Sequence, residues 1–186
     1  MQPLETQVLE ATIAAVSRFG MRKTSVNDIA EKAKVSRQTI YNLFGNKEDV
    51  YRAAILHMGT LWCAKAREKL EPATDLSEQL DAVFDVFCVD GFTFSRANDD
   101  TMDMLTEVRL VAPDALAAFN ALFKELFVEV FTPHETAIVQ SGLSVDQLAD
   151  RVEIACRGMK REATSLDHLR TLIATEKTLV LNLVGQ

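Results

Sequence analysis

The sequence predicts an all-α fold, and two observations carry that prediction. Apolar residues recur every three to four positions along almost the whole chain, which is the period of a helix with one buried face. Alternating runs of β-branched residues, which mark strands, are nearly absent. With 186 residues, of which 48% are hydrophobic and 25% charged, the chain is long enough to bury the core of one domain or of two small ones.

Capping and breaking residues divide the chain into about nine expected helices. Gly20 ends the first helix, Thr24 or Ser25 caps the second, and Ser36 caps the third. Later breaks are expected at Pro72, Asp90-Gly91, Pro113, Pro133 and Ser141-Gly142. The expected ranges are about 6–19, 25–34, 36–43, 47–70, 75–89, 98–111, 114–131, 144–162 and 166–183.

The segment from Ser25 to Phe44 has the proportions of a helix-turn-helix: a capped short helix, a tight turn and a second capped short helix within about twenty residues. If Ile40, Leu43 and Phe44 face inward, the outward positions carry side chains suited to DNA. Arginine reads guanine, glutamine and asparagine suit adenine, threonine contacts thymine or phosphate, and a tyrosine hydroxyl suits a phosphate oxygen. These outward residues are Arg37, Gln38, Thr39, Tyr41 and Asn42.

The charge distribution supports the same interpretation. The whole chain is acidic, with a net charge of -7, which argues against coating of nucleic acid by bulk charge. Residues 18–52, however, carry eight basic and four acidic side chains and so a charge of +4, whereas residues 53–186 carry -9. Free backbone N–H groups at the helix starts near Thr24, Ser36 and Asn46 add donors for phosphate.

The stretch TSVNDIAEKAKVSRQTIYNLFGNKE, residues 24–48, resembles the DNA-binding signature of the tetracycline-repressor-like (TetR) transcriptional regulators. The resemblance covers roughly residues 6–55, and beyond residue 70 it rests only on helix number and length. It implies that the helix Ser36–Leu43 enters the major groove, that the start at Thr24-Ser25 holds phosphates, and that Lys47 clamps the DNA backbone.

The sequence departs from the family pattern at Lys34, where the family usually has glycine because the turn favours a positive φ. A lysine in that conformation costs roughly 1 kcal/mol. A phosphate contact from Lys34 would offset that cost.

The acidic part of the chain holds eight of the ten phenylalanines, between Phe84 and Phe131. They form helical stripes that are either core or the wall of a ligand pocket. The resemblance implies that the fourth to seventh helices enclose an effector cavity, so we expect a small, mostly apolar effector. Asp99, Asp103 and Glu107 share one expected helix face, which is either solvated or, as the alternative, faces a cationic effector. The candidate effector residues are His57, Trp62, Phe84, Phe87, Cys88, Met104, Glu107, Phe119 and Phe123.

The last two expected helices carry apolar stripes that are either buried within the chain or paired with a second copy. The resemblance implies a homodimer in which these helices form a four-helix bundle. A dimer also suits DNA recognition, since one short helix contacts few bases. The candidate interface residues are Leu148, Val152, Ala155, Met159, Leu169, Leu172, Ile173 and Leu179.

Taken together, the sequence predicts a helix-turn-helix DNA-binding domain at residues 1–50 and an effector-binding and dimerisation domain at residues 51–186. The expected function is that of a homodimeric, cytoplasmic regulator that acts as a repressor, and its expected partners are an operator in double-stranded DNA and a small molecule. A helical ligand-binding protein that does not use DNA is the alternative. We expect no enzyme, cofactor or metal, since no catalytic or ligating motif is present, and no membrane span.

Overall fold

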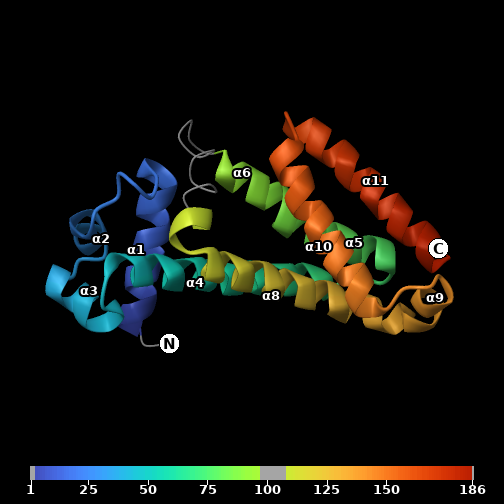
Figure 1. Cartoon of the computed structure of the whole chain (residues 1–186), viewed down its shortest axis with the longest axis horizontal. Helices are drawn as coiled ribbons and strands as arrows, with labels where there is room; N and C mark the ends of the chain where they lie inside the picture. The colour runs from blue at the N-terminus through green and yellow to red at the C-terminus, as the bar shows by residue number, and fades with distance from the viewer. Residues whose placement is uncertain (1–2, 97–107, 186) are drawn as a thin grey trace. The chain divides into compact units, whose positions relative to one another are not determined.

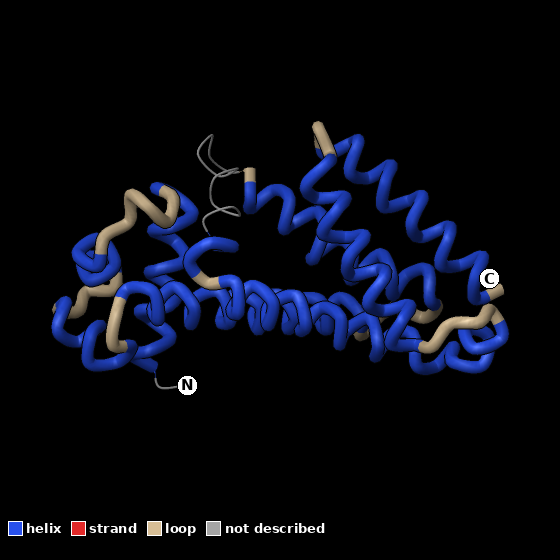
Figure 2. Tube along the Cα trace, in the orientation of Figure 1, coloured by secondary structure: helices blue, strands red, loops and turns tan. Residues whose placement is uncertain are grey.

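The structure is a computed structural model that describes residues 3–96 and 108–185, and within these ranges it contains helices and turns but no strand (Figures 1 and 2). The prediction of an all-α fold is therefore confirmed. The chain divides into two compact units, Met1–Thr60 with Phe94–Phe119, and Leu61–Thr93 with Asn120–Gln186. The expected domain boundary after residue 50 stays a prediction, and it falls inside the long helix α4, Lys47–Leu70.

The first unit contains three N-terminal helices and the first part of α4. These helices are α1 (Pro3–Phe19), α2 (Val26–Lys32) and α3 (Arg37–Phe44), and α2 packs against both α1 and α3. Val8, Ile29, Ile40 and Val50, one from each of the four helices, have no exposed surface. The first residues of α8 (Pro113–Phe131) also belong to this unit, where Asp114 pairs with Arg52 of α4.

The second unit is built around buried phenylalanines. Its helices include α5 (Leu76–Phe84), a π-helix η1 (Asp85–Asp90), the 3₁₀ turn η2 (Thr132–His134), α9 (Glu135–Gln140), α10 (Val145–Glu162) and α11 (Leu166–Val184). Helices α10 and α11 lie side by side, and both pack against η1 (Figure 1). The phenylalanine cluster, defined as Phe84, Phe87, Phe123, Phe127 and Phe131, is at most 1% exposed.

Two of the expected helix boundaries are wrong. The helix expected to end before Asp90-Gly91 continues, because Gly91 has helical angles (φ -61°, ψ -41°) and α6 (Gly91–Ser95) follows η1 directly. The break expected between Pro133 and Ser141 contains η2 and α9, and Pro133 stands in the first turn of η2, where its missing N–H costs nothing. The helix expected at 98–111 lies mostly outside the described residues, of which 108–111 are helical.

Candidate nucleic-acid interface

The start of α2 is fixed by a reciprocal pair of caps. The Ser25 hydroxyl oxygen accepts from the Asp28 N–H at 3.2 Å, and the Asp28 carboxylate accepts from the backbone N–H and the hydroxyl of Ser25, both at 2.7 Å. The hydrogen bond from the Ser25 side chain is the main cause that lowers the pKa of Asp28. Of the two residues expected at this start, Ser25 is the exposed one. Thr24 is fully buried and its hydroxyl donates to the Gly20 carbonyl at 2.7 Å, so we leave Thr24 out of the proposed DNA contacts.

The turn between α2 and α3 has the hydrogen bonds of a Schellman motif, with Lys34 at its left-handed position. The Lys34 N–H donates to the Glu31 carbonyl at 3.1 Å, and the Val35 N–H donates to the Ala30 carbonyl at 3.0 Å. The φ of Lys34 is 52°, and Lys34 is the only non-glycine residue with positive φ among those the structure describes. The positive φ expected from the sequence is thus present, on a residue with a Cβ.

Helix α3 presents its polar face outward. Ser36 caps the helix by accepting from the Thr39 N–H at 3.0 Å, and Ile40 anchors the opposite side with no exposed surface. Leu43 and Phe44, also expected inside, are only half-buried. The polar face of α3 consists of the exposed residues Arg37, Gln38 and Asn42 and the half-buried residues Thr39 and Tyr41.

Gln38 and Asn42 are held together on this face before any ligand binds. The Gln38 side-chain Nε2 donates to the side-chain Oδ1 of Asn42 at 2.8 Å, one helical turn away. This bond uses the Gln38 Nε2 donor and the Asn42 Oδ1 acceptor. The side-chain Oε1 of Gln38 therefore remains as an acceptor, and the side-chain Nδ2 of Asn42 remains as a donor. Such a combination is complementary to the N6 and N7 edge of adenine.

The first turn of α4 connects to the helices before it. Gly45 ends α3 with a φ of 87°, a conformation that favours glycine, and the Asn46 side chain accepts from the Asp49 N–H at 2.9 Å. The Lys47 ammonium lies 5.3 Å from the centroid of the Tyr51 ring. The Tyr51 hydroxyl lies 2.9 Å from the Met21 carbonyl oxygen and 3.0 Å from that of Thr24, which ties α4 to the connection between α1 and α2.

The basic side chains of this region are largely left for an anionic partner. Arg52 forms ion pairs with Asp49 and Asp114, and these hydrogen bonds raise its pKa. Within residues 3–96 and 108–185, by contrast, no carboxylate lies within 4.0 Å of the charged nitrogens of Lys32, Lys34, Arg37 or Lys47. Three of these four, Lys34, Arg37 and Lys47, flank or belong to α3 and its turn, so positive charge lies beside the polar face.

The residues expected to bind an effector are divided between the two units. His57 and Phe119 belong to the first, the others that are described belong to the second, and Met104 and Glu107 lie outside the described residues. His57 is buried, and its Nε2 has no hydrogen-bond partner among the described residues. Phe87 stacks on Phe123 with the ring centroids 4.0 Å apart, which is the packing of a filled core.

Sequence reasoning missed Lys160, whose ammonium lies 3.5 Å from the centroid of the Phe87 ring. Burial lowers the pKa of Lys160. The side chain crosses Gly91, where an added Cβ would come within 3.2 Å of the Trp62 ring and 3.3 Å of the Lys160 chain. Gly91 therefore serves close packing and not a helix break, and no periodicity in the sequence signals that role.

The N-terminal segment is similar to that of known bacterial regulators. Residues 8–54 match the model of the bacterial regulatory proteins of the tetR family. This N-terminal segment therefore belongs to the tetR family. Among curated relatives, it is 28% identical over 90 residues to the HTH-type transcriptional regulator BetI of Paraburkholderia phymatum, covering 46% of each chain. It is 30% identical over 73 residues to the uncharacterized HTH-type regulator YhgD of Bacillus subtilis, covering 39% of this chain and 38% of that one. These matches span less than half the length of the curated relatives.

Solved structures share the tetR-like fold over nearly the whole chain. A putative TetR-family transcriptional regulator from Rhodococcus sp. has a TM-score of 0.74 at 18% identity, over 96% of this chain and 98% of that one. The fatty acid degradation regulator FadR from Bacillus halodurans has a TM-score of 0.70 at 20% identity, over 97% and 96%. At these identities the likeness concerns the fold alone.

The residues expected at a dimer interface differ in their exposure. Leu148, Val152, Leu169 and Ile173 are at most 9% exposed within one copy, so their side chains are occupied by the protomer's own core. Ala155, Met159 and Leu172 are half-buried, and Leu179 is 51% exposed. Ile154 of α10, which the sequence reasoning did not select, is 50% exposed. The apolar positions that remain for a partner are therefore mainly Ile154 and Leu179.

Two further observations concern other kinds of site. Across the described ranges there is no group of three or more His, Cys, Asp or Glu side chains arranged to hold a metal ion. No helix in the same ranges combines the length and the apolarity that crossing a membrane requires.

Proposed function

We propose that the chain is a sequence-specific DNA-binding transcription regulator whose polar face of α3 reads bases in the major groove. The observation that carries the proposal is the combination of exposed Arg37, Gln38 and Asn42 on one short helix with neighbouring cations that have no acidic partner among the described residues. Arg37 supplies guanine recognition, and the Gln38–Asn42 pair supplies adenine recognition. Lys34 and Lys47 neutralise phosphates on either side.

The proposed regulator acts as a homodimer, because a single helix of eight residues contacts too few bases for specific binding. The proposed contact involves the exposed side chains of Ile154 and Leu179. Two copies related by a two-fold axis would recognise a palindromic operator with half-sites one or more helical turns apart.

We also propose that a small, mostly apolar effector controls the affinity for DNA, most simply as the release of a repressor. A solved neighbour of the same fold, FadR from Bacillus subtilis, is in complex with stearoyl-CoA, at a TM-score of 0.58 and 19% identity over 96% of this chain and 97% of that one. Tyr51 provides a route for the response, since any movement of α4 acts on the Met21 and Thr24 carbonyls and so on the start of α2. A cytoplasmic location fits this function.

Selection from a random double-stranded DNA library tests the core of the proposal. The purified chain should enrich a palindrome, and the enriched sequence should be bound at least 10³-fold more tightly than random DNA at physiological salt. The triple variant Arg37→Ala/Gln38→Ala/Asn42→Ala is the control and should enrich no sequence. Failure of the wild-type chain to enrich any sequence would leave a ligand-binding protein without a DNA role.

A further inference from the structure

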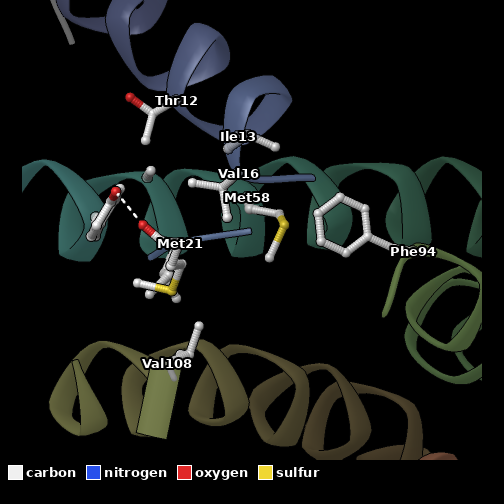
Figure 3. Close-up of a pocket in the computed structure, with 10 residues that line it drawn as sticks. Thr12, Ile13, Val16, Met21, Met58, Phe94 and Val108 are labelled. Atoms are coloured by element: carbon white, nitrogen blue, oxygen red, sulfur yellow. Dashed lines mark hydrogen bonds between the residues drawn. The ribbon is translucent and has the colours of Figure 1, made fainter. Parts of the chain in front are cut away.

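The first unit contains a small apolar cavity of about 50 Å³, which we call the α1 cavity. Its walls come from α1, from the connection after α1, from α4, and from the described residues on either side of the 97–107 segment. Figure 3 shows Thr12 and Ile13 of α1 above α4, Val16 at the level of α4, Met58 beside Phe94, and Val108 on the side opposite to Thr12. The lining residues are Thr12, Ile13, Val16, Met21, Tyr51, Ala54, Ile55, Met58, Phe94 and Val108.

Among the described residues, the lining of the α1 cavity offers no free polar group to a ligand. Of its two hydroxyl-bearing walls, Thr12 donates to the Val8 carbonyl at 2.8 Å, and Tyr51 is engaged with the carbonyls of Met21 and Thr24. The rest of the lining is hydrocarbon and the sulfur of two methionines. A water molecule needs two to four polar partners, so it is disfavoured here, and a charged ligand would lose its hydration without compensation.

The volume limits what the α1 cavity can take. An apolar cavity of about 150 Å³ in another protein stays dry and binds benzene or xenon. The α1 cavity has about a third of that volume, so its occupant is a single heavy atom or an apolar group of a few carbons. The flexible side chains of Met21 and Met58 allow some adjustment to the occupant's shape.

The position of the α1 cavity gives its occupancy a consequence. Tyr51 is both a wall of the cavity and the residue bonded to the carbonyls before α2. Met21 is also both a wall and one of those bonded residues. An atom placed between α1 and α4 therefore acts directly on the contact that holds the helix-turn-helix segment to α4.

We propose that the α1 cavity is a binding site for an uncharged apolar group of a few carbons, and that its occupancy changes the affinity of the chain for DNA. The site differs from the expected effector residues, none of which lines it. The binding step stands on the cavity alone, whereas the effect on DNA rests on the proposed function.

Xenon is the probe for the binding step, read from the ¹³C-methyl signals of the methionines. The Met21 and Met58 methyls should shift saturably with xenon pressure, and the Met159 methyl of α10 should not. Ala54→Val fills the cavity from α4, and Val16→Ile fills it from α1, so each should reduce the shift at least five-fold. Ala66 is a fully buried residue of α4 that does not line the cavity, so Ala66→Val should leave the xenon-induced shift unchanged. Absence of a saturable shift in the wild-type chain would overturn the proposal whatever the variants do.

The coupling step is tested with the enriched DNA and the same probe. Xenon at saturating pressure should change the apparent Kd for that DNA at least two-fold, and Ala54→Val should abolish the change. Methionine shifts with no change in Kd would overturn the coupling. The wild-type affinity measured without xenon reports on the proposed function separately, so the two failures are distinguishable.

Discussion

The hydroxyl oxygen of Tyr51, in the second turn of α4, lies 2.9 Å from the backbone carbonyl oxygen of Met21, thirty residues earlier in the chain. The same hydroxyl lies 3.0 Å from the Thr24 carbonyl oxygen. Both carbonyls belong to the connection between α1 and α2, outside the two helices. Tyr51 is only 4% exposed, so water does not replace its hydroxyl easily. The helix-turn-helix segment is therefore fastened to α4 by a side chain as well as by the chain itself.

Tyr51→Phe should destabilise the chain by about 1–3 kcal/mol, because it leaves buried carbonyl oxygens without their donor. Urea unfolding followed by circular dichroism measures the loss. Tyr41→Phe is the matched control on α3, where the ring is half-buried, and it should change the unfolding free energy by less than about 0.5 kcal/mol. Equal effects of the two substitutions would show that the Tyr51 hydroxyl does not secure the connection.

Lys34→Gly should raise the unfolding free energy by about 1 kcal/mol, because glycine adopts the φ of 52° without a Cβ penalty. The same change should weaken binding to DNA through loss of a phosphate contact. It should also lower the salt slope, meaning the slope of log affinity against log salt concentration, by about one. Lys34→Ala removes the charge but keeps the Cβ, so it should weaken binding equally without the gain in stability. Stabilisation by alanine as large as that by glycine would rule out backbone strain as the cause.

Unfolding should become easier between pH 9 and 11 because of Cys63. Burial raises the pKa of this thiol from 9.0 to about 11, so over that interval the unfolded chain releases a proton that the folded chain retains. The unfolding free energy then falls as pH rises. Urea titrations from pH 8 to 11 should show a shallower fall for Cys63→Ala than for the wild type. Parallel curves would mean that the folded thiol ionises as readily as the unfolded one.

Leu179→Glu should convert the proposed dimer into a folded monomer, because its side chain is 51% exposed and is free to face a partner. Light scattering gives the mass, and circular dichroism confirms that the helices remain. Val152→Glu places a charge at a fully buried position and should unfold the chain instead. If Leu179→Glu, Ile154→Glu and the wild type all have the same dimer mass, the interface lies elsewhere.

The helix-turn-helix segment was predictable because its signals are local. Ser25 and Ser36 accept from N–H groups three residues ahead, and the positive φ of Lys34 was expected from the resemblance to the tetR pattern, which usually has glycine there. The π-helix η1 and the continuation of the helix through Gly91 were not predictable, since the close approach of Trp62 and Lys160 to this glycine is a tertiary contact. Periodicity also identified Val152 as apolar without indicating whether it faces its own core or a second copy.

Whether the phenylalanine stripes line a pocket was less predictable still, because phenylalanines have the same helical spacing in a pocket as in a packed core. Phe87 and Phe123 stack at 4.0 Å with no exposed surface, whereas the α1 cavity is lined by alanine, valine and methionine among others. A void forms where neighbouring side chains fail to fill space, and that depends on tertiary packing.

The most direct test of the account is the salt-dependent affinity of Arg37→Ala and Lys47→Ala for the enriched palindrome and for random DNA. Arg37→Ala should lower the discrimination between the two by about 1–3 kcal/mol, since it removes a base contact. Lys47→Ala should weaken binding to the palindrome and to random DNA alike, and it should reduce the salt slope by about one. Lys69→Ala, in the last turn of α4, should change neither the affinities nor the salt slope. Loss of affinity equal for all three variants, or for none, would contradict the assignment of α3 and the start of α4 to DNA.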